Sequence, residues 1–378
     1  MSYRTQWCGE VIETMAGSRV QLAGWVHRRR DLGNLVFIDL RDRTGLLQLV
    51  FDPTRQVAAH AASHSLRNEF VITVMGTVVM RDQERINPNL ATGHVEVIVD
   101  ELTILAEAKP LPFLPDDHDE VDEAIRLKYR YIDLRRSRMH ENLRLRDRTV
   151  QAVRRHLESE GFIEVETPIL TKSTPEGARD FLVPSRLQPG RFYALPQSPQ
   201  LFKQLLMIAG YERYYQIARA FRDEDLRADR QPEHTQIDVE MSFIEEEDIQ
   251  NVIEAMIRRV FAETLSVDLP CPFPRLTYAE AMRRFGSDKP DMRFGMEIVD
   301  ISDLAAQAEF RVFAETLVSG GVVRGLRAAG AGSSSRKDVD GLAAVAAPCG
   351  ARGVSAIWVE EAGIRSPLAK FLAPEVVD

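Results

Sequence analysis

A charged segment in the middle of the chain, residues 221–238, holds residue types that bind a phosphate-rich substrate. Side chains alternate along a strand, so Arg222 and Glu224 share one face of a first predicted strand, and Asp238 lies on a face of the next. Charges rarely point to the covered side of a sheet without a partner or ligand. The loop between the strands adds Arg227, Arg230 and Gln231. A nucleoside triphosphate is therefore a natural ligand, and a solvated face with surface ion pairs is the alternative.

Two polar clusters upstream are candidates to hold a second reactant. Gln200 and Lys203 follow Ser198-Pro199 in the first turn of a predicted helix and share one face of it. A lysine there can hold a carboxylate as a point charge. The loop 171–180 contains Gly and Pro and can close over a ligand. The alternatives are an exposed first turn and a plain connecting loop.

A third candidate site lies near the N-terminus, where Arg28-Arg29-Arg30 precede a predicted strand. On that strand Val36, Ile38 and Leu40 alternate with Phe37, so the former can fill a core while Phe37 points outward. Gln48 on the next strand faces outward as well. A lone surface Phe usually needs no explanation. Because three arginines lie nearby, an alternative is that the Phe37 ring stacks on a nucleic-acid base.

The elements that must position these residues fall into several parts. Five runs rich in Val, Ile and Leu within residues 1–108 predict a small closed barrel such as an OB-fold. A Pro-rich and acidic linker leads into a hinge at 109–140. Residues 141–295 alternate between helix and strand, and a further module follows at 296–378. The strands expected around the charged segment are 214–224 and 235–243, and another is expected at 162–170. The fold class is therefore α+β with several domains.

Composition limits the classes of protein. The chain has 378 residues, a formal charge of −9 and three cysteines. The negative charge disfavours indiscriminate binding to nucleic acid, so any contact must come from local basic patches. The odd, scattered cysteines fit a reducing cytoplasm, and no apolar run is long enough to cross a bilayer. We expect a cytoplasmic protein without membrane contact.

Together these segments resemble the bacterial-type aspartyl-tRNA synthetases, which are class II aminoacyl-tRNA synthetases. The resemblance implies an OB-fold anticodon-binding barrel, an antiparallel-sheet catalytic domain and the start of an insertion domain. The matching segments are the barrel around 24–32, the hinge at 127–136, motif 1 at 161–170, the substrate-closing loop at 174–180, motif 2 at 221–238 and the insertion domain from about 296.

The resemblance implies a role for each matching residue. Arg222 is the expected catalytic residue, because it would bridge the ATP α-phosphate and the amino-acid carboxylate. The residues expected to read aspartate are Glu176, Ser198, Gln200, Lys203, Arg222, Gln236 and Asp238. Those expected to bind ATP are Arg222, Asp223, Glu224, Gln231 and His234. Those expected to read the tRNA(Asp) anticodon are Arg28, Arg30, Phe37 and Gln48. The implied partners are L-aspartate, ATP with Mg²⁺, tRNA(Asp) and a second copy of the chain bound through motif 1.

Two features depart from the family pattern. His234 stands where the family usually has a Phe under the adenine ring, so ATP affinity is expected to be weaker or pH-dependent. The Gly-rich motif 3, with its Arg and metal-holding acids, is not found. The segment 330–336 lies in the insertion region, and its serines are expected to cap a helix starting near Lys337. We therefore expect the N-terminal portion of a longer synthetase, with the metal ligands beyond Asp378.

Two other functions compete with an aspartate–tRNA ligase. A catalytically inactive synthetase-like protein that binds tRNA fits the missing motif 3. A lysyl- or asparaginyl-tRNA synthetase shares the architecture, but Gln200, Lys203 and Asp238 together argue against both. The 378 residues by themselves are expected to bind an anticodon stem-loop without forming aspartyl-adenylate. The residues do not indicate whether tRNA(Asn) is charged as well.

Overall fold

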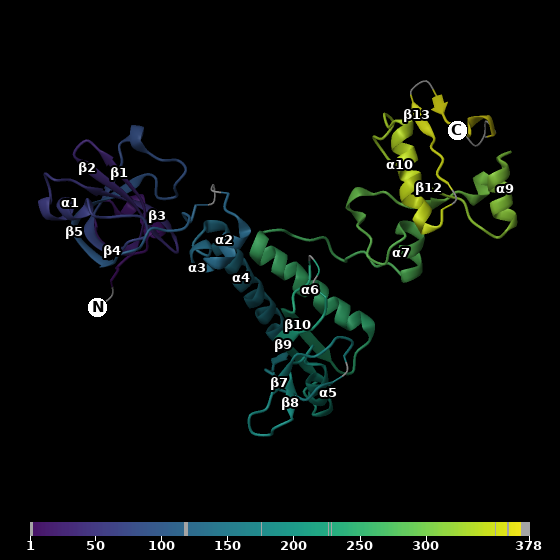
Figure 1. Ribbon diagram of the computed structural model, residues 1–378, viewed down its shortest axis with the longest axis horizontal. Coiled ribbons are helices and arrows are strands. Elements are labelled where there is room, and N and C mark those ends of the chain that lie inside the picture. The colour runs from purple at the N-terminus through teal and green to yellow at the C-terminus, as the bar shows by residue number, and fades with distance from the viewer. Residues whose placement is uncertain are drawn as a thin grey trace. The chain divides into compact units, whose positions relative to one another are not determined.

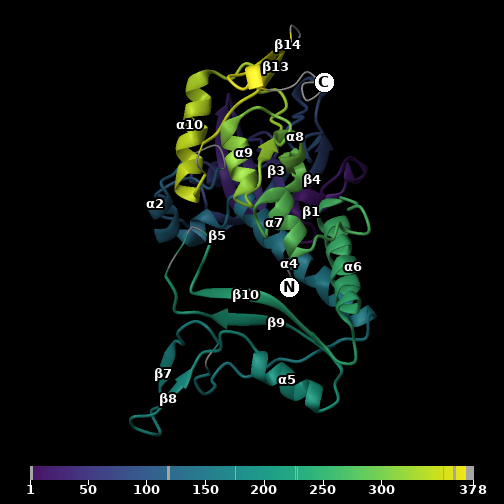
Figure 2. The same cartoon turned by 90° about the vertical axis from the view of Figure 1, so that its right-hand side faces the viewer.

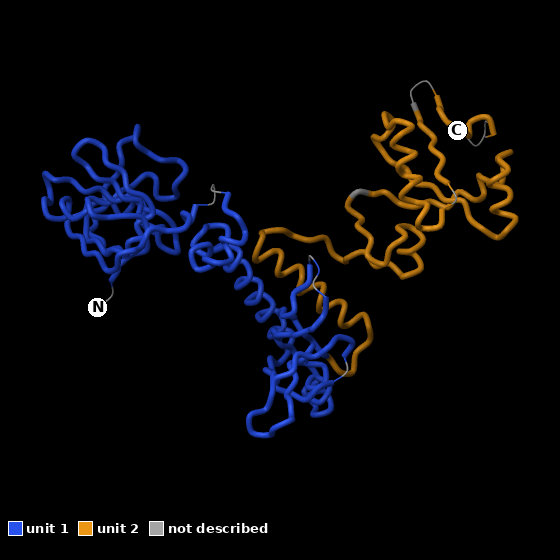
Figure 3. Tube along the Cα trace, in the orientation of Figure 1, with its two compact units in different colours: residues 1–240 blue, residues 241–378 orange. Residues whose placement is uncertain are grey.

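The computed structural model describes residues 3–116, 120–174, 176–225, 227, 229–351, 353–360 and 363–371. Backbone contacts group the chain into two compact units, residues 1–240 and 241–378 (Figure 3). The first unit contains the barrel, the hinge and the strands of the charged segment. The domain boundary expected near residue 295 is not tested by this division into units and stays a prediction.

A closed five-stranded barrel forms the start of the first unit, as the sequence predicts (Figure 1). Its strands follow the spatial order β1-β2-β3-β5-β4. Their bounds are β1 Arg19–Leu32, β2 Leu35–Asp42, β3 Gly45–Phe51, β4 Val71–Met80 and β5 Val95–Ala106, with helix α1 at Val57–Ser63. Arg28 to Arg30 precede β2, as expected, and they are themselves part of β1, which runs on to Leu32.

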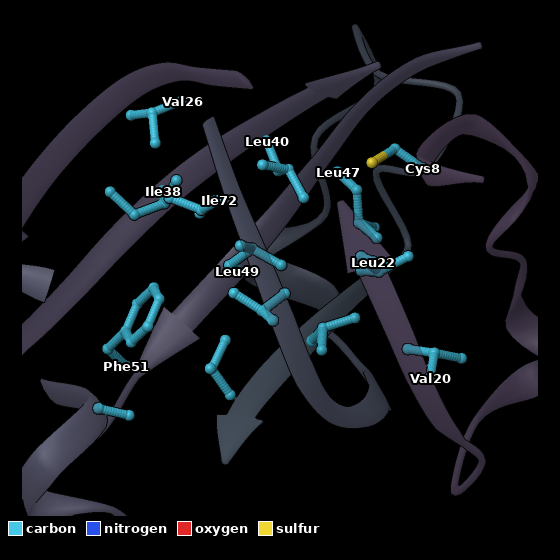
Figure 4. Packing of buried hydrophobic residues seen from close by; sticks show 14 of the residues in the cluster. Cys8, Val20, Leu22, Val26, Ile38, Leu40, Leu47, Leu49, Phe51 and Ile72 are labelled. Atoms are coloured by element: carbon cyan, nitrogen blue, oxygen red, sulfur yellow. The ribbon is translucent and has the colours of Figure 1, made fainter. Parts of the chain in front are cut away.

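The barrel interior is the largest apolar core of the first unit, and it comes from alternate residues of each strand (Figure 4). Val36, Ile38 and Leu40 of β2 are almost wholly buried, as predicted. Leu49 of β3 packs among them without exposed surface. Closure also needs a glycine, because a Cβ on Gly76 would lie 2.3 Å from the carbonyl oxygen of Ile98.

The hinge is joined to the barrel through one buried carboxylate. Its helices are α2 Glu123–Lys128 and α3 Arg130–Asp133, and α4 Ser137–Ser159 follows. Glu69 of the barrel is 3% exposed and accepts two hydrogen bonds of 2.7 Å from Arg41. Arg135, just after α3, donates to the same carboxylate and lies over the ring of Trp25, 5.3 Å from its centroid. The barrel is therefore linked to the hinge by a shared charge cluster.

A small sheet between two helices carries the charged segment. Its order is β10-β9-β6, with β6 Ile163–Glu164, β9 Arg213–Phe221 and β10 Glu233–Met241. Helix α5 Gln200–Ile208 contacts β9 and, through Lys203, β10. On the other side, Arg146 of α4 donates to Thr235 of β10. Figure 2 shows β9 and β10 side by side above α5. The hairpin β7 Leu182–Pro184 and β8 Phe192–Ala194 lies beside them.

Three predicted strands end earlier than expected. The strand expected at 162–170 is only two residues long, and it pairs with β9 in parallel. Pro168 would in any case stop a strand before residue 170, because it cannot donate to a ladder and restricts the residue before it. The strands of the charged segment end at Phe221 and Met241, earlier than expected. The amide of Arg222 still donates to the carbonyl of Pro232 at 2.8 Å, so pairing continues just past β9.

The second unit holds helices and short two-stranded sheets. Its elements are α6 Glu246–Leu265, α7 Tyr278–Phe285, β11 Ile298–Asp300, α8 Ser302–Ala305, α9 Arg311–Val318, β12 Arg324–Leu326, α10 Arg336–Ala346, β13 Trp358–Glu360 and β14 Gly363–Arg365. Ser335 caps α10 in a capping box with Asp338, which confirms the helix start predicted there. Across the described residues, no helix is both long and apolar enough to span a membrane.

Removing a core side chain of the barrel should lower its stability. Leu49 has no exposed surface, so Leu49→Ala is expected to reduce the free energy of unfolding of residues 1–108 by about 2–5 kcal/mol. Urea denaturation followed by circular dichroism measures this. The matched control is Leu105→Ala, at a leucine that is 39% exposed, with an expected loss under about 1 kcal/mol. Equal losses in the two variants would contradict a core at Leu49.

Candidate active site and nucleic-acid face

The polar face of β9 and β10 is the covered face of the sheet. Gln216, Ala218 and Ala220 of β9 are buried, and Asp238 of β10 has a side chain only 12% exposed. Ile237, on the opposite face, is 45% exposed. The sheet thus places its charge inward, which requires specific partners.

Lys203 of α5 supplies the partner. Its ammonium group lies 2.9 Å from Asp238 Oδ1 and 3.2 Å from Glu240 Oε2. Burial alone would lower the pKa of Lys203, but the hydrogen bonds and charges of the two carboxylates more than offset it, and the pKa is raised. Lysine has three donors, so this pair of contacts leaves one for a ligand. The other oxygen of Asp238, Oδ2, is buried and finds no hydrogen-bond partner among the residues that the structure describes.

The start of α5 brings a second pair of predicted residues together. Ser198 Oγ donates to Glu176 Oε2 at 2.9 Å, although the two residues are 22 positions apart. The helix begins at Gln200, one residue later than expected, and Pro199 is its N-cap. Ser198 still takes part in capping, because its Oγ accepts from the amide of Gln200 at 3.3 Å. Glu176, Ser198 and Lys203 therefore lie around the start of one helix.

The loop after β9 holds the residues expected to bind ATP. Glu224 accepts from Arg230 at 3.0 Å, and the Asp223 amide donates to the carbonyl of Arg179 at 3.0 Å. Arg222 is partly buried, and across the described residues its guanidinium makes no hydrogen bond or ion pair. Gln231 is exposed, whereas His234 and Gln236 are partly buried. The contacts with ATP predicted for Gln231 and His234, and the contact with aspartate predicted for Gln236, are not tested by this structure.

On the barrel, strand register gathers the predicted anticodon residues on one outer face. Arg28 faces Asp39, which faces Gln48, and Arg30 faces Phe37. Arg30 donates to Asp39 at 2.7 Å and to Gln48 at 3.0 Å. Burial raises the pKa of Asp39, and the nearby Arg30 opposes that rise. Phe37 is partly exposed beside this cluster, in the position where an aromatic ring can stack on a base.

Some residues of the site were not among the predicted ones. Glu240 shares Lys203 with Asp238, and alternation along β10 gave the signal, since both lie on the same face. Tyr214 is fully buried and donates to Gln216 at 2.8 Å. Burial raises the pKa of Tyr214, and the charges of Asp238 and Glu240 add to the rise. Its neighbours in the sequence, Arg213 and Tyr215, gave no hint of this position.

Comparison with known proteins identifies the family. The profile of the class II tRNA synthetases (D, K and N) matches residues 122–361. The chain belongs to this family. A profile of the OB-fold nucleic-acid-binding domain matches residues 20–105, which confirms the OB-fold predicted for the barrel.

Curated relatives carry one activity in their names. The "Aspartate--tRNA(Asp/Asn) ligase" of Moorella thermoacetica is 58% identical over 369 residues, which are 98% of this chain and 61% of that protein. The "Aspartate--tRNA ligase" of Geobacillus kaustophilus is 55% identical over 98% of this chain and 63% of its own length. This chain thus spans roughly three fifths of the length of these two relatives.

A solved synthetase shares the fold. It is the asparaginyl-tRNA synthetase of Pyrococcus horikoshii, complexed with asparaginyl-adenylate. Its TM-score is 0.66 at 25% sequence identity, covering 82% of this chain and 71% of that one. The similarity supports the class II architecture read from the sequence.

Lys203 should stabilise the fold as well as the site. In Lys203→Met, Asp238 and Glu240 lose their counter-ion, and the free energy of unfolding at pH 7 should fall by about 1–3 kcal/mol, below the cost of breaking a fully buried pair. Urea denaturation of residues 1–378 measures it. Lys172→Met, at an exposed lysine, is the control, with an expected change within about 0.5 kcal/mol. A variant as stable as this control would rule out a stabilising role for the ion pair.

Proposed function

We propose that the chain is part of an aspartate–tRNA ligase that activates L-aspartate with ATP and transfers it to tRNA(Asp). The observation that carries the proposal is the Lys203 ammonium held between Asp238 and Glu240 in a covered site. Its remaining donor suits the side-chain carboxylate of aspartate, and the unpartnered Oδ2 of Asp238 suits an ammonium group. The names of the relatives support the same substrate.

The proposed chemistry has two steps. The aspartate carboxylate attacks the α-phosphorus of ATP in line, releasing pyrophosphate and forming aspartyl-adenylate. A terminal ribose hydroxyl of the tRNA then attacks the acyl carbon and releases AMP. Positioning and charge neutralisation drive both steps. Arg222 would bridge the two anions of the first step, and Glu176, Ser198, Gln200 and Gln236 would hold aspartate. Asp223, Glu224, Gln231 and His234 would hold ATP.

Magnesium is the expected companion of ATP in this reaction. Within the described part of the chain, no group of three or more His, Cys, Asp or Glu side chains is arranged to hold a metal ion. The two carboxylates of the site, Asp238 and Glu240, are already engaged with Lys203. The described residues therefore offer no preformed cluster of protein ligands for magnesium.

Selectivity for aspartate follows from the charge of Lys203. An asparagine side chain would offer the ammonium a neutral amide, and the charged group would lose a counter-charge in a covered site. Arg28, Arg30, Phe37 and Gln48 on the barrel would read the anticodon. We further propose a cytoplasmic homodimer formed through the motif 1 segment, residues 161–170.

Isothermal titration of residues 1–378 with L-aspartate and L-asparagine tests the substrate. Aspartate should bind at least tenfold more tightly. A chimera that adds the unmatched part of the Moorella thermoacetica relative should catalyse aspartate-dependent pyrophosphate exchange. Anticodon stem-loop binding without amino-acid binding or exchange would favour the inactive tRNA-binding alternative.

Arg222 should be indispensable in that chimera. A lysine cannot span two anions with a planar fork, so Arg222→Lys should cut pyrophosphate exchange by orders of magnitude. Arg227→Lys, in the same loop, is the matched control and should lose less. Exchange above about a tenth of the parent rate in Arg222→Lys, a barrier change under ~1.4 kcal/mol, would remove Arg222 from the centre of the mechanism.

Phe37 should contribute to RNA binding and not to the activation of aspartate. Phe37→Ala is expected to weaken binding of a tRNA(Asp) anticodon stem-loop by about 1–3 kcal/mol, the worth of one base–aromatic stack. Fluorescence anisotropy of a labelled stem-loop measures it. Exchange in the chimera should stay unchanged, and an equal loss there would count against a role confined to the anticodon.

A further inference from the structure

Gln197 is a buried side chain next to the site that no proposed function has used. It is 4% exposed and directly precedes Ser198. Its amide makes a reciprocal pair of hydrogen bonds with the backbone of Ala178: Oε1 accepts from the amide at 2.9 Å, and Nε2 donates to the carbonyl at 2.8 Å. Nε2 also donates to Asp180 Oδ1 at 2.7 Å. The side chain of Gln197 thus pairs with the backbone of Ala178 as a neighbouring strand would, next to the isolated antiparallel bridge between Arg179 and Asp223.

The segment held in this way, residues 176–180, contains Glu176 and is fixed at further points. Ser198 Oγ donates to Glu176 at one end. At the other end, the Arg179 carbonyl accepts from the amide of Asp223, the residue after Arg222. The segment 176–180 therefore touches both the start of α5 and the loop after β9, and Gln197 holds its middle.

Asp180 keeps the segment in a single arrangement. Its second oxygen, Oδ2, accepts from Ser173 Oγ at 2.6 Å. Burial would raise the pKa of Asp180, but the hydrogen bonds from Ser173, Gln197 and the backbone of Thr174 more than compensate, and the pKa is lowered. The ionised carboxylate is thus the form that these donors select. An ionised acceptor also strengthens the hydrogen bond from Gln197.

We propose that Gln197 is a positioning residue for aspartate binding: its amide fixes residues 176–180 so that Glu176 stays at Ser198. The choice of aspartate as the ligand rests on the proposed function. The contacts of Gln197 with residues 176–180 rest on the structure alone. Gln197 does not touch aspartate in this proposal. It acts through the backbone of Ala178 and through Asp180.

The contact is tested first without substrate, by hydrogen–deuterium exchange of residues 1–378. In Gln197→Ala, peptides covering 176–180 should exchange roughly tenfold to a hundredfold faster, because three hydrogen bonds to the segment are lost. Peptides from the barrel should not change. Gln188→Ala, at an exposed glutamine of the same region, is the matched control and should leave 176–180 unchanged.

Isothermal titration with L-aspartate then tests the consequence. Gln197→Ala and Gln197→Glu should both raise the aspartate Kd by about tenfold. The Glu variant keeps the size of the side chain but faces Asp180 and the Ala178 carbonyl with an acceptor. A role in packing alone predicts that Gln197→Glu is tolerated. In the double variant Gln197→Glu with Asp180→Asn, the new amide at position 180 can donate to the Glu carboxylate. This variant should recover part of the aspartate affinity lost in Gln197→Glu.

The outcomes separate the two proposals. Unchanged exchange of 176–180 in Gln197→Ala would overturn the positioning role, and so would faster exchange with an unchanged aspartate Kd. If the parent chain binds no aspartate, the proposed function and the role of Gln197 in binding both fail. The exchange data would then still decide whether Gln197 holds the segment.

Discussion

The catalytic part of the chain is organised around one covered cation. Lys203 draws two carboxylates of β10 to the inner face of a small sheet, and that face is polar where a sheet usually buries apolar groups. Because the three charges compensate one another, α5 can pack against β9 and β10 without a large apolar contact. The same compensation leaves one lysine donor and one carboxylate oxygen for a small zwitterion.

The N-terminal barrel depends on a different kind of stabilisation. Its core is built from alternate residues of five strands, and closure leaves no unpaired edge among them. The residues that stabilise the barrel and those proposed to contact RNA therefore lie on opposite faces of the strands. The inner face holds the fold, while the outer face is free to carry Arg30, Phe37 and Gln48.

The sequence was sufficient for elements with a strong local pattern. Runs rich in Val, Ile and Leu predicted the five barrel strands, and alternation predicted the inward position of Ile38. The serines before Arg336 predicted the start of α10. It failed for the strand at 162–170, whose apolar residues suggested a longer strand than the pair Ile163 and Glu164 that the structure has. Lys203 and Asp238 were both singled out, but their pairing joins residues 35 positions apart. Gln197 went unnoticed because only the fold shows that Ala178 lies opposite its amide.

The cluster around Glu69 has a consequence for modularity. Glu69 belongs to the barrel, yet one of its two arginine partners, Arg135, comes from the hinge, and Glu69 itself adopts a backbone φ of 68° that side-chain-bearing residues rarely adopt. An anticodon domain exchanged with that of another synthetase would bring a foreign residue opposite Arg135. A working transplant must therefore carry the acid and both arginines together, so the natural cutting point for domain exchange lies after residue 135 and not at the end of the barrel.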